Sequence, residues 1–587
     1  MHAKNILLAG TVLLASGCDM LRPTLTVRVK AVLPCDQQDA LDSVGIMQLR
    51  VVSADGTEAT IQGSRSKGKA SLPNLEISDG TVVFINGYPG EDPAAVEGIP
   101  SAVGASAPMN LKAFTEESRF PAARSYPKDK TETVAVPVGK INSFASTTDV
   151  GGSTCSSMGR PRHSHTATFS SATGKVYIIG GLTYAEQDGA ETFVPKDSAL
   201  EIYDPSTGTY QSAVGQVSAE FQPLFVRAFH TATELPGGKI LVWGGIVQSG
   251  ADGRDVAPWA VSFVLDPASL SITQLGPPAF RIKRFNHTAT LTRSGTSVII
   301  GGGCGCKGSL TAQDIKAGRC PALADTCADG QPRVAALEIY DVATGVITPL
   351  TNSLLDKPRA FHSATALEGE LVVFAGGDDG NAVIREVEIF RGGSQAGLLK
   401  PVTDQLPQGV THPAAVALPT EDCTLLDPTH PADFECVLVV GGCTSPIGTN
   451  GECSQAVAGS TIMDMGRAPA SRMVTGPQGN RTRWGHQAFF LAAGTNMVMT
   501  AGGRFEVLTS DSLPVSAEIL PRLAAQGGGP TPFRPAPVPL MVDARHRFAT
   551  TRLTSGQVMF TGGTESIAST TTRKSLGSGE LFFFPFR

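Results

Sequence analysis

Short apolar runs that end in two glycines recur along most of this 587-residue chain. Runs such as KVYIIGG and LVVFAGG are short and rich in β-branched residues, which predicts buried β-strands rather than helices. One diglycine has little meaning, but seven copies that share order and spacing indicate an internal repeat. The seven pairs are Gly180–Gly181, Gly244–Gly245, Gly301–Gly302, Gly376–Gly377, Gly441–Gly442, Gly502–Gly503 and Gly562–Gly563.

Two further elements accompany most of these runs. Upstream lies an Arg-x-x-His motif, as in Arg227 to His230, followed by small residues. Downstream lies an alternating strand that often closes on Asp, as in Ala336–Asp341, and residues typical of turns follow it. The motif arginines are Arg162, Arg227, Arg284, Arg359, Arg483 and Arg545.

Two copies depart from the Arg-x-x-His motif. The fifth keeps His412 with Gly409 in place of the arginine, and the seventh keeps Arg545 with Phe548 in place of the histidine. Because the histidines recur at equivalent places in separate repeats, we expect them to have a structural role.

Four short antiparallel strands, repeated seven times, predict a β-propeller. One twisted four-stranded sheet has two apolar faces, so neighbouring sheets around a ring are needed to cover them. The repeats resemble the kelch family, which is marked by the diglycine after the second strand and a Glu-x-Tyr-Asp third strand. The resemblance implies an all-β fold with a seven-bladed kelch-type β-propeller over residues 160–587.

The seventh repeat has its third strand at Gly579–Phe584, close to the last residue of the sequence. We expect its fourth strand to come from Val134–Ala145, within a linker over residues 132–159, so that no strand edge stays unpaired. Residues 18–131 contain no repeat. Their strand-like runs predict an N-terminal β-sandwich of the immunoglobulin-like type that acts as a stalk.

Residues 1–17 are typical of a signal peptide, because Lys4 precedes a short apolar run and Ala15-Ser16-Gly17 supplies small residues. The next residue, Cys18, makes the segment resemble a bacterial lipobox, although Ala15 stands where that motif usually has Leu. The resemblance implies export and anchoring to the lipid bilayer of the cell envelope through acylated Cys18, on the periplasmic or surface side of a membrane that the sequence does not identify. An ordinary secretory signal is the alternative.

The other ten cysteines are an even number, which fits disulfides in an oxidising compartment. We expect Cys423–Cys436 and Cys443–Cys453 bridges, and a Cys35–Cys155 bridge between stalk and propeller. The connectivity among the remaining four stays open. Their Cys-x-Cys and Cys-x₆-Cys spacings differ from those of structural zinc sites, so we expect disulfides and no metal. These four are Cys304, Cys306, Cys320 and Cys327.

Little in the sequence indicates catalysis. A net charge of -6 gives no basic footprint for nucleic acid. The sequence contains no Gly-x-Ser-x-Gly elbow and no Asp box, and its seven tyrosines fall in no motif typical of a copper oxidase. We therefore expect no catalytic residues and no cofactor.

The six motif arginines are the candidate ligand-binding residues. In kelch propellers their position lies near the mouth of the central channel, where guanidinium groups could bind carboxylates or phosphates. The alternative is a structural role in salt bridges between adjacent blades. Their partners would then be Glu201, Glu338, Glu388, Glu518 and Glu580.

Two functions remain in competition. The leading prediction is a non-enzymatic binding scaffold at the cell envelope, with a protein or a glycan as its partner. The alternative is a carbohydrate-active envelope enzyme, such as an oxidase or a sugar epimerase, on the same fold.

Overall fold

The computed structural model describes the chain in segments that are almost entirely β-structure. The one α-helix within these segments is α3 (Thr420–Leu426), so the all-β prediction is confirmed. The described residues are 7–13, 24–53, 55–64, 80–90, 100–107, 130–149, 154–184, 191–249, 255–258, 261–276, 282–305, 333–350, 355–393, 396–399, 403–426, 434–446, 453–469, 471–479, 481–491, 498–504, 517–520, 541–566 and 573–584.

The N-terminal segment forms one seven-stranded sheet in the order β1-β2-β7-β6-β5-β3-β4. Strand β7 pairs with β2 on one side and with β6 on the other, which joins all seven strands into a single sheet. The predicted immunoglobulin-like sandwich of two sheets is therefore wrong for the described residues. The strands are β1 (Leu7–Leu13), β2 (Thr24–Val32), β3 (Ile46–Val52), β4 (Glu58–Ser64), β5 (Val82–Tyr88), β6 (Ala102–Ala105) and β7 (Lys130–Lys140).

The expected signal peptide lies only partly within the described residues. Leu7–Leu13 forms strand β1, which pairs antiparallel with β2, whereas Cys18 lies outside the described residues. None of the described helices is both long and apolar enough to cross a bilayer.

Seven small antiparallel sheets follow, which we number one to seven in chain order. Each contains one diglycine run as its second strand, placed between the first and third strands. The second strands are almost wholly buried, as their apolar residues predict. The first strands are β9 (Thr166–Ser170), β15 (Thr231–Glu234), β21 (Thr288–Leu291), β25 (Ser363–Leu367), β29 (Ala414–Leu418), β33 (Gln487–Phe490) and β36 (Ala549–Arg552). The second strands are β10 (Lys175–Ile179), β16 (Ile240–Trp243), β22 (Ser297–Gly301), β26 (Leu371–Ala375), β30 (Cys436–Val440), β34 (Val498–Ala501) and β37 (Val558–Thr561).

The third and fourth strands complete these sheets, except that sheet six has three strands among the described residues. Three two-stranded ribbons stand apart from the sheets. The third strands are β13 (Leu200–Asp204), β19 (Phe263–Asp266), β23 (Leu337–Asp341), β27 (Glu388–Arg391), β31 (Ser460–Asp464), β35 (Ala517–Leu520) and β40 (Gly579–Phe583). The fourth strands are β14 (Thr209–Ser212), β20 (Ser271–Gln274), β24 (Ile347–Leu350), β28 (Gly397–Leu398), β32 (Met473–Thr475) and, in sheet seven, β8 (Ser143–Ser146). The ribbons pair β11 (Leu182–Tyr184) with β12 (Glu191–Phe193), β17 (Ile246–Ser249) with β18 (Asp255–Pro258), and β38 (Thr564–Ser566) with β39 (Arg573–Ser575).

Each of the seven sheets buries its apolar faces against the sheets before and after it. Seven separate apolar clusters each combine residues of two consecutive sheets, and one of them joins sheet seven to sheet one. First strands contact in the same succession from β9 to β33, and β36 contacts β9. Sheets six and seven are joined where Arg552 donates to the carbonyl of Phe490 at 3.1 Å. The apolar burial that stabilises each sheet therefore depends on its two neighbours.

The diglycines make the closest backbone contacts between consecutive sheets. The N–H of the second glycine donates to a carbonyl of the next sheet at 2.8–2.9 Å in all seven copies, and Gly563 of sheet seven donates to Arg162 of sheet one. The first glycine leaves room for that carbonyl: a Cβ on Gly180 would lie 2.1 Å from the carbonyl oxygen of Arg227. Both glycines have positive φ, so both the space and the backbone conformation require glycine.

In the third copy the structural pair is shifted by one residue from the predicted one. Gly301 belongs to β22, and the two glycines with positive φ are Gly302 and Gly303. Gly303 makes the bond to the next sheet, through the carbonyl of Arg359. The run of three glycines made the sequence ambiguous at this point.

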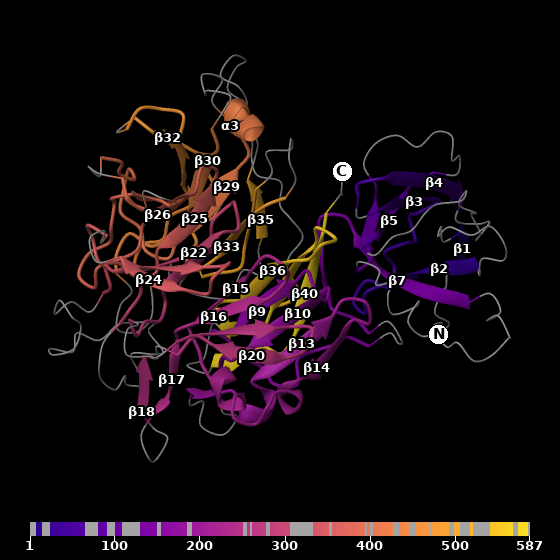
Figure 1. Cartoon of the computed structure of the whole chain (residues 1–587). Helices are drawn as coiled ribbons and strands as arrows, with labels where there is room; N and C mark the ends of the chain where they lie inside the picture. Colours follow the sequence, from indigo (N-terminus) through magenta and orange to yellow (C-terminus); the bar gives the residue numbers. More distant parts are fainter. Residues whose placement is uncertain are drawn as a thin grey trace.

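The N-terminal sheet and the repeats meet where sheet seven meets sheet one (Figure 1). Strand β8 pairs with β40, with Phe144 opposite Phe582. The segment expected to supply this strand is thus divided, because its first part lies in β7 of the N-terminal sheet.

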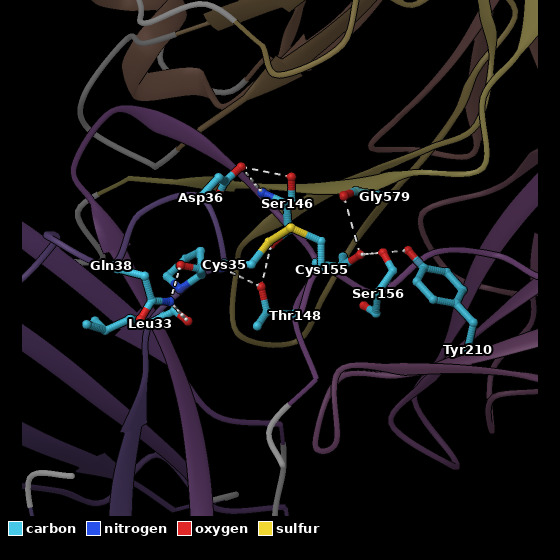
Figure 2. The surroundings of a disulfide bond; sticks show 12 residues. Leu33, Cys35, Asp36, Gln38, Ser146, Thr148, Cys155, Ser156, Tyr210 and Gly579 are labelled. Carbon is cyan, nitrogen blue, oxygen red and sulfur yellow. Dashed lines mark hydrogen bonds between the residues drawn. A yellow bond between two sulfur atoms is a disulfide. The ribbon is translucent and has the colours of Figure 1, made fainter. Parts of the chain in front are cut away.

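A disulfide between Cys35 and Cys155 ties the N-terminal sheet to this junction (Figure 2). Beside it, the backbone N–H of Ser146 donates to the Asp36 carboxylate at 2.9 Å. Cys423–Cys436 and Cys443–Cys453 are also bonded, as the sequence predicted. Cys304 is disulfide-bonded as well, and Cys306, Cys320 and Cys327 lie outside the described residues. These bonds indicate an extracellular or periplasmic location.

Replacing Gly180 by Ala should lower the free energy of unfolding by about 2 to 4 kcal/mol, because the new Cβ meets a backbone carbonyl and φ is positive. Chemical denaturation of the purified protein measures this. Gly215→Ala is the matched control, since a Cβ there has no neighbour within 4 Å, and it should change stability by less than about 0.5 kcal/mol. Equal effects of the two substitutions would refute the role assigned to the diglycines.

Candidate active site

The six motif arginines are buried structural residues, with exposed fractions of 0 to 2%. Each guanidinium donates to the carbonyl of the first structural glycine of its own sheet at 2.7–3.3 Å. The predicted ligand-binding role is therefore wrong, because these groups are already bonded and out of reach of a ligand. The six are Arg162, Arg227, Arg284, Arg359, Arg483 and Arg545.

Five of these arginines also pair with a buried glutamate, but within one sheet rather than between neighbours. Arg284 donates to Glu338 at 2.9 Å, for example. Sheet two has Phe263 in the place of the glutamate, and the Arg227 guanidinium lies 5.1 Å from the centre of its ring. Burial lowers the pKa of Arg227 to about 9. The five pairs are Arg162–Glu201, Arg284–Glu338, Arg359–Glu388, Arg483–Glu518 and Arg545–Glu580.

The repeated histidines connect consecutive sheets. In three copies the histidine Nε2 lies 2.9–3.0 Å from the hydroxyl of the threonine that follows the histidine of the preceding sheet. His486 has no such hydroxyl, since Ala414 stands there, and neither of its ring nitrogens has a hydrogen-bond partner among the described residues. The three pairs are His230–Thr166, His287–Thr231 and His362–Thr288.

His412 is not the equivalent of these histidines. Gly377 donates to the carbonyl of Val410, so Val410 holds the place of the arginine and Pro413 that of the histidine. His412 therefore lies one residue earlier in the motif. The predicted alignment of the fifth copy was off by one residue, because the motif there has lost both of its marker side chains.

His412 belongs instead to a set that we call the left-handed ring, one residue from each copy. Each member precedes the repeated histidine, or the residue in its place, has a φ of 51 to 60°, and is half-buried between fully buried neighbours. Five backbone N–H···O bonds of 2.9–3.2 Å join consecutive members, including one from Ser164 to Arg547. Since every copy shares this conformation, it is a property of the fold. The members are Ser164, Phe229, Asn286, Phe361, His412, Gly485 and Arg547.

Aromatic and cationic side chains gather on the left-handed ring. The rings of Phe361 and His412 stack with centres 4.3 Å apart, and the edge of Trp484 packs against His412. The Arg547 guanidinium lies 5.7 Å from the ring centre of Phe229. Burial lowers the pKa of His412 to about 4, with Asp378 opposing and Arg547 adding to the effect, so His412 is neutral at pH 7. The ring therefore presents flat apolar faces beside a fixed positive charge.

One carboxylate joins this cluster from the ribbon of sheet one. Oε1 of Glu191 accepts from the Tyr184 hydroxyl at 2.9 Å, lies 3.4 Å from Nε2 of His163, and lies 3.5 Å from Arg547. The Glu191 side chain is only 6% exposed. Nδ1 of His163 lies 3.1 Å from the hydroxyl of Ser164. A hydroxyl, an imidazole and a carboxylate thus lie in a row, which we call the polar chain; its contact between Nε2 of His163 and Oε1 of Glu191 has an ion-pair distance and is not a hydrogen bond.

Three buried polar atoms of this cluster have no hydrogen-bond partner among the described residues: Oε2 of Glu191, Nδ2 of Asn286 and Nε1 of Trp484. Buried polar atoms without partners are rare in folded proteins and call for a ligand, a water or a catalytic role. One is an acceptor and the others are donors, so they can bond to the hydroxyl and carbonyl groups of a ligand.

Metal binding has no support within the described ranges, where no cluster of three or more His, Cys, Asp or Glu side chains could hold an ion. A small cavity lies elsewhere, at the junction with the N-terminal sheet, and is lined by Pro137, Phe169, Tyr203 and Leu581 among others. None of its lining residues belongs to the left-handed ring.

This cluster lies outside the repeated Arg and His positions, so none of the predictions made from the repeats included it. The two positions between them vary, and they carry His163, Ser164, Trp484, His546 and Arg547. The signal that could have revealed the cluster was the variation of the side chains at the two positions between the motif arginine and histidine. Glu191 left no such signal, because only the pairing of β11 with β12 brings it to His163.

No protein-family model matches this chain, and no match was found among curated proteins. Among solved structures, one that is similar is described as a novel fungal alcohol oxidase with catalytic diversity among the AA5 family, in complex with copper. The similarity covers 72% of this chain and 74% of that chain, at 13% sequence identity and a TM-score of 0.46.

The leading prediction of a non-enzymatic binding scaffold is wrong as the main interpretation. The similar solved structure is that of an enzyme.

The buried histidines should make the protein lose stability in acid. Burial lowers the pKa of His362 to about 3, whereas the unfolded chain binds a proton near pH 6.5. The unfolded state therefore holds the extra proton between these values, and the free energy of unfolding falls as pH decreases below about 6.5. Each such histidine adds about 1.4 kcal/mol per pH unit to the slope.

His362→Gln should make the slope of stability against pH shallower by about one proton between pH 6 and 4, as measured by urea denaturation. Thr288→Val is the control, since it removes the hydroxyl partner but keeps the titrating ring, and its slope should match that of the unaltered protein. A slope unchanged by His362→Gln would contradict a buried neutral imidazole.

Proposed function

We propose that the seven sheets form a seven-bladed kelch-type β-propeller. The support is the cyclic order of contacts: each sheet buries its faces against two neighbours, and Gly563 bonds to Arg162 across the junction of the last and the first. The diglycine after the second strand and the Glu-x-Tyr-Asp third strand, as in β13 and β23, agree with the kelch pattern. The left-handed ring would then surround one mouth of the central channel.

The function we propose is that of a carbohydrate-active enzyme of the cell envelope, with its site at the left-handed ring. The observation that carries this proposal is the Glu191 cluster, in which a buried carboxylate keeps one oxygen without a partner beside the imidazole of His163. A sugar has apolar ring faces and many hydroxyls, which suits the aromatic side chains of the left-handed ring together with the polar atoms of Glu191 and Asn286.

Two groups of the cluster can take part in proton transfer. Glu191 and His163 are within reach of each other, and the hydroxyl of Tyr184 and the charge of Arg547 hold the carboxylate in place. A carboxylate and an imidazole so placed can accept and return a proton as general base and acid. Burial strengthens these interactions, because water is largely excluded from them.

Glu191→Gln tests this proposal. The amide keeps the shape but cannot accept a proton, so turnover of envelope glycans in a substrate screen, followed by mass spectrometry, should fall at least about a hundredfold. Glu220→Gln, an exposed glutamate outside the cluster, is the control and should retain full turnover. Equal turnover in the two variants, or no glycan processed by the unaltered protein, would refute the proposed function.

We also propose that the protein is a lipoprotein anchored through Cys18. The motif before this cysteine and the disulfides, which require export, support the proposal. Metabolic labelling with an alkyne fatty acid should mark the unaltered protein, and Cys18→Ala should abolish both the label and membrane retention. Unchanged membrane retention of Cys18→Ala would refute the anchor.

A further inference from the structure

The polar chain at the left-handed ring has the order of a nucleophile, a base and an orienting acid. The Ser164 hydroxyl lies 3.1 Å from Nδ1 of His163, and Nε2 of the same imidazole lies 3.4 Å from Oε1 of Glu191. A serine hydroxyl becomes a nucleophile when an adjacent imidazole can take its proton and a carboxylate stabilises the imidazolium that results. We propose that Ser164 is the catalytic nucleophile of an esterase, with His163 as its base and Glu191 as the orienting carboxylate.

The exposure of the three residues suits these roles. Ser164 is half-buried on the left-handed ring, whereas His163 is fully buried and the Glu191 side chain is 6% exposed. His163, the base, is therefore shielded from water and lies between Ser164 and Glu191. Tyr184 stacks on the His163 ring with centres 5.0 Å apart, and its hydroxyl bonds to Glu191, so one side chain fixes both partners.

The arrangement has no sequence signature because it is not built on a Gly-x-Ser-x-Gly elbow. Ser164 and His163 are adjacent in the chain, and the positive φ of Ser164, 55°, belongs to the turn that precedes the repeated histidine. The imidazole uses Nδ1 toward the hydroxyl and Nε2 toward the acid. Both nitrogens of an imidazole can exchange protons, so this orientation supports the same chemistry.

The reaction balances with water as the only co-reactant. Ser164 Oγ attacks the carbonyl carbon of an ester while its proton moves to His163 Nδ1. The tetrahedral intermediate then breaks its bond to the alcohol oxygen, which takes the proton from His163 and leaves as a hydroxyl group. His163 then takes a proton from water, and the water oxygen attacks the acyl-serine. The second tetrahedral intermediate collapses and releases the carboxylic acid, while His163 returns the proton to the Ser164 oxygen.

This inference rests on the proposed function and narrows it: the substrate class is an acyl ester of a carbohydrate, and the products are a free sugar hydroxyl and a carboxylic acid. Asn286 is a candidate donor to the ester oxygen, because its Nδ2 is buried and has no partner among the described residues. A donor aimed at the developing oxyanion would stabilise the intermediate.

A fluorophosphonate probe tests the nucleophile on the full-length protein. We expect one equivalent of label, mapped to Ser164 by peptide mass spectrometry, and hydrolysis of 4-nitrophenyl acetate that falls at least about a hundredfold in both Ser164→Ala and His163→Gln. Ser445→Ala, a half-buried serine outside the cluster, is the control and should keep label and hydrolysis. Label absent, label at another residue, or hydrolysis unaffected by Ser164→Ala would overturn the inference.

Two readouts separate this inference from the proposed function. Thermal denaturation of Ser164→Ala should match that of the unaltered protein, which excludes loss of folding as the cause of lost label. Binding of acetylated and deacetylated envelope glycans is measured by calorimetry on Ser164→Ala. If Ser164→Ala binds glycans but the probe does not label the unaltered protein, only the role of Ser164 as nucleophile is overturned. If the probe labels Ser164 but no glycan binds, the carbohydrate assignment is overturned and the role of Ser164 as nucleophile stands.

Discussion

The hydrogen bond from the second glycine of each structural pair to a carbonyl of the next sheet is the interaction on which the rest of the structure depends. It requires two backbones to approach so closely that a Cβ on the first glycine would overlap the accepting carbonyl, as at Gly180 and Arg227. Seven such bonds join all seven sheets and return from Gly563 to Arg162. The apolar faces can then be buried between neighbours, since the backbones hold them at a fixed separation.

The motif arginines and histidines serve the same contact. Each arginine donates to the carbonyl of the first structural glycine of its own sheet, so one side chain fixes the turn that carries the bond to the neighbour. Histidines fill the adjacent space and reach the hydroxyls of the preceding sheet. Buried charges are tolerated where a carboxylate and backbone carbonyls surround them, and sheet two shows that an aromatic face can take the place of the carboxylate. Repetition of a residue was in this case a sign of structural use.

The chemistry of the molecule lies in what does not repeat. Between the positions of the motif arginine and histidine in each copy lie two residues whose side chains differ among copies, and the backbone of the second is set by the fold. The fold thus brings six side chains of five kinds to one ring at no further conformational cost, because each turn already has to form. Such a frame allows a hydroxyl, an imidazole, an aromatic face and a guanidinium to meet although they come from distant parts of the chain.

From the sequence alone one can predict the repeat, the strand type, the seven diglycine runs and three disulfide pairs, because each depends on local patterns or on the spacing of rare residues. The sequence could not determine that the arginines are buried, since the same guanidinium can bind a ligand or a backbone carbonyl. It placed His412 and Gly301 one residue out of alignment, because their neighbours had lost or multiplied the marker residues. Only the tertiary structure brought Glu191 to His163 and joined β7 to both β2 and β6. The first contact depends on the pairing of β11 with β12, and the second on the pairing of both edges of β7 with other strands. Neither pairing produces a periodic pattern in the sequence.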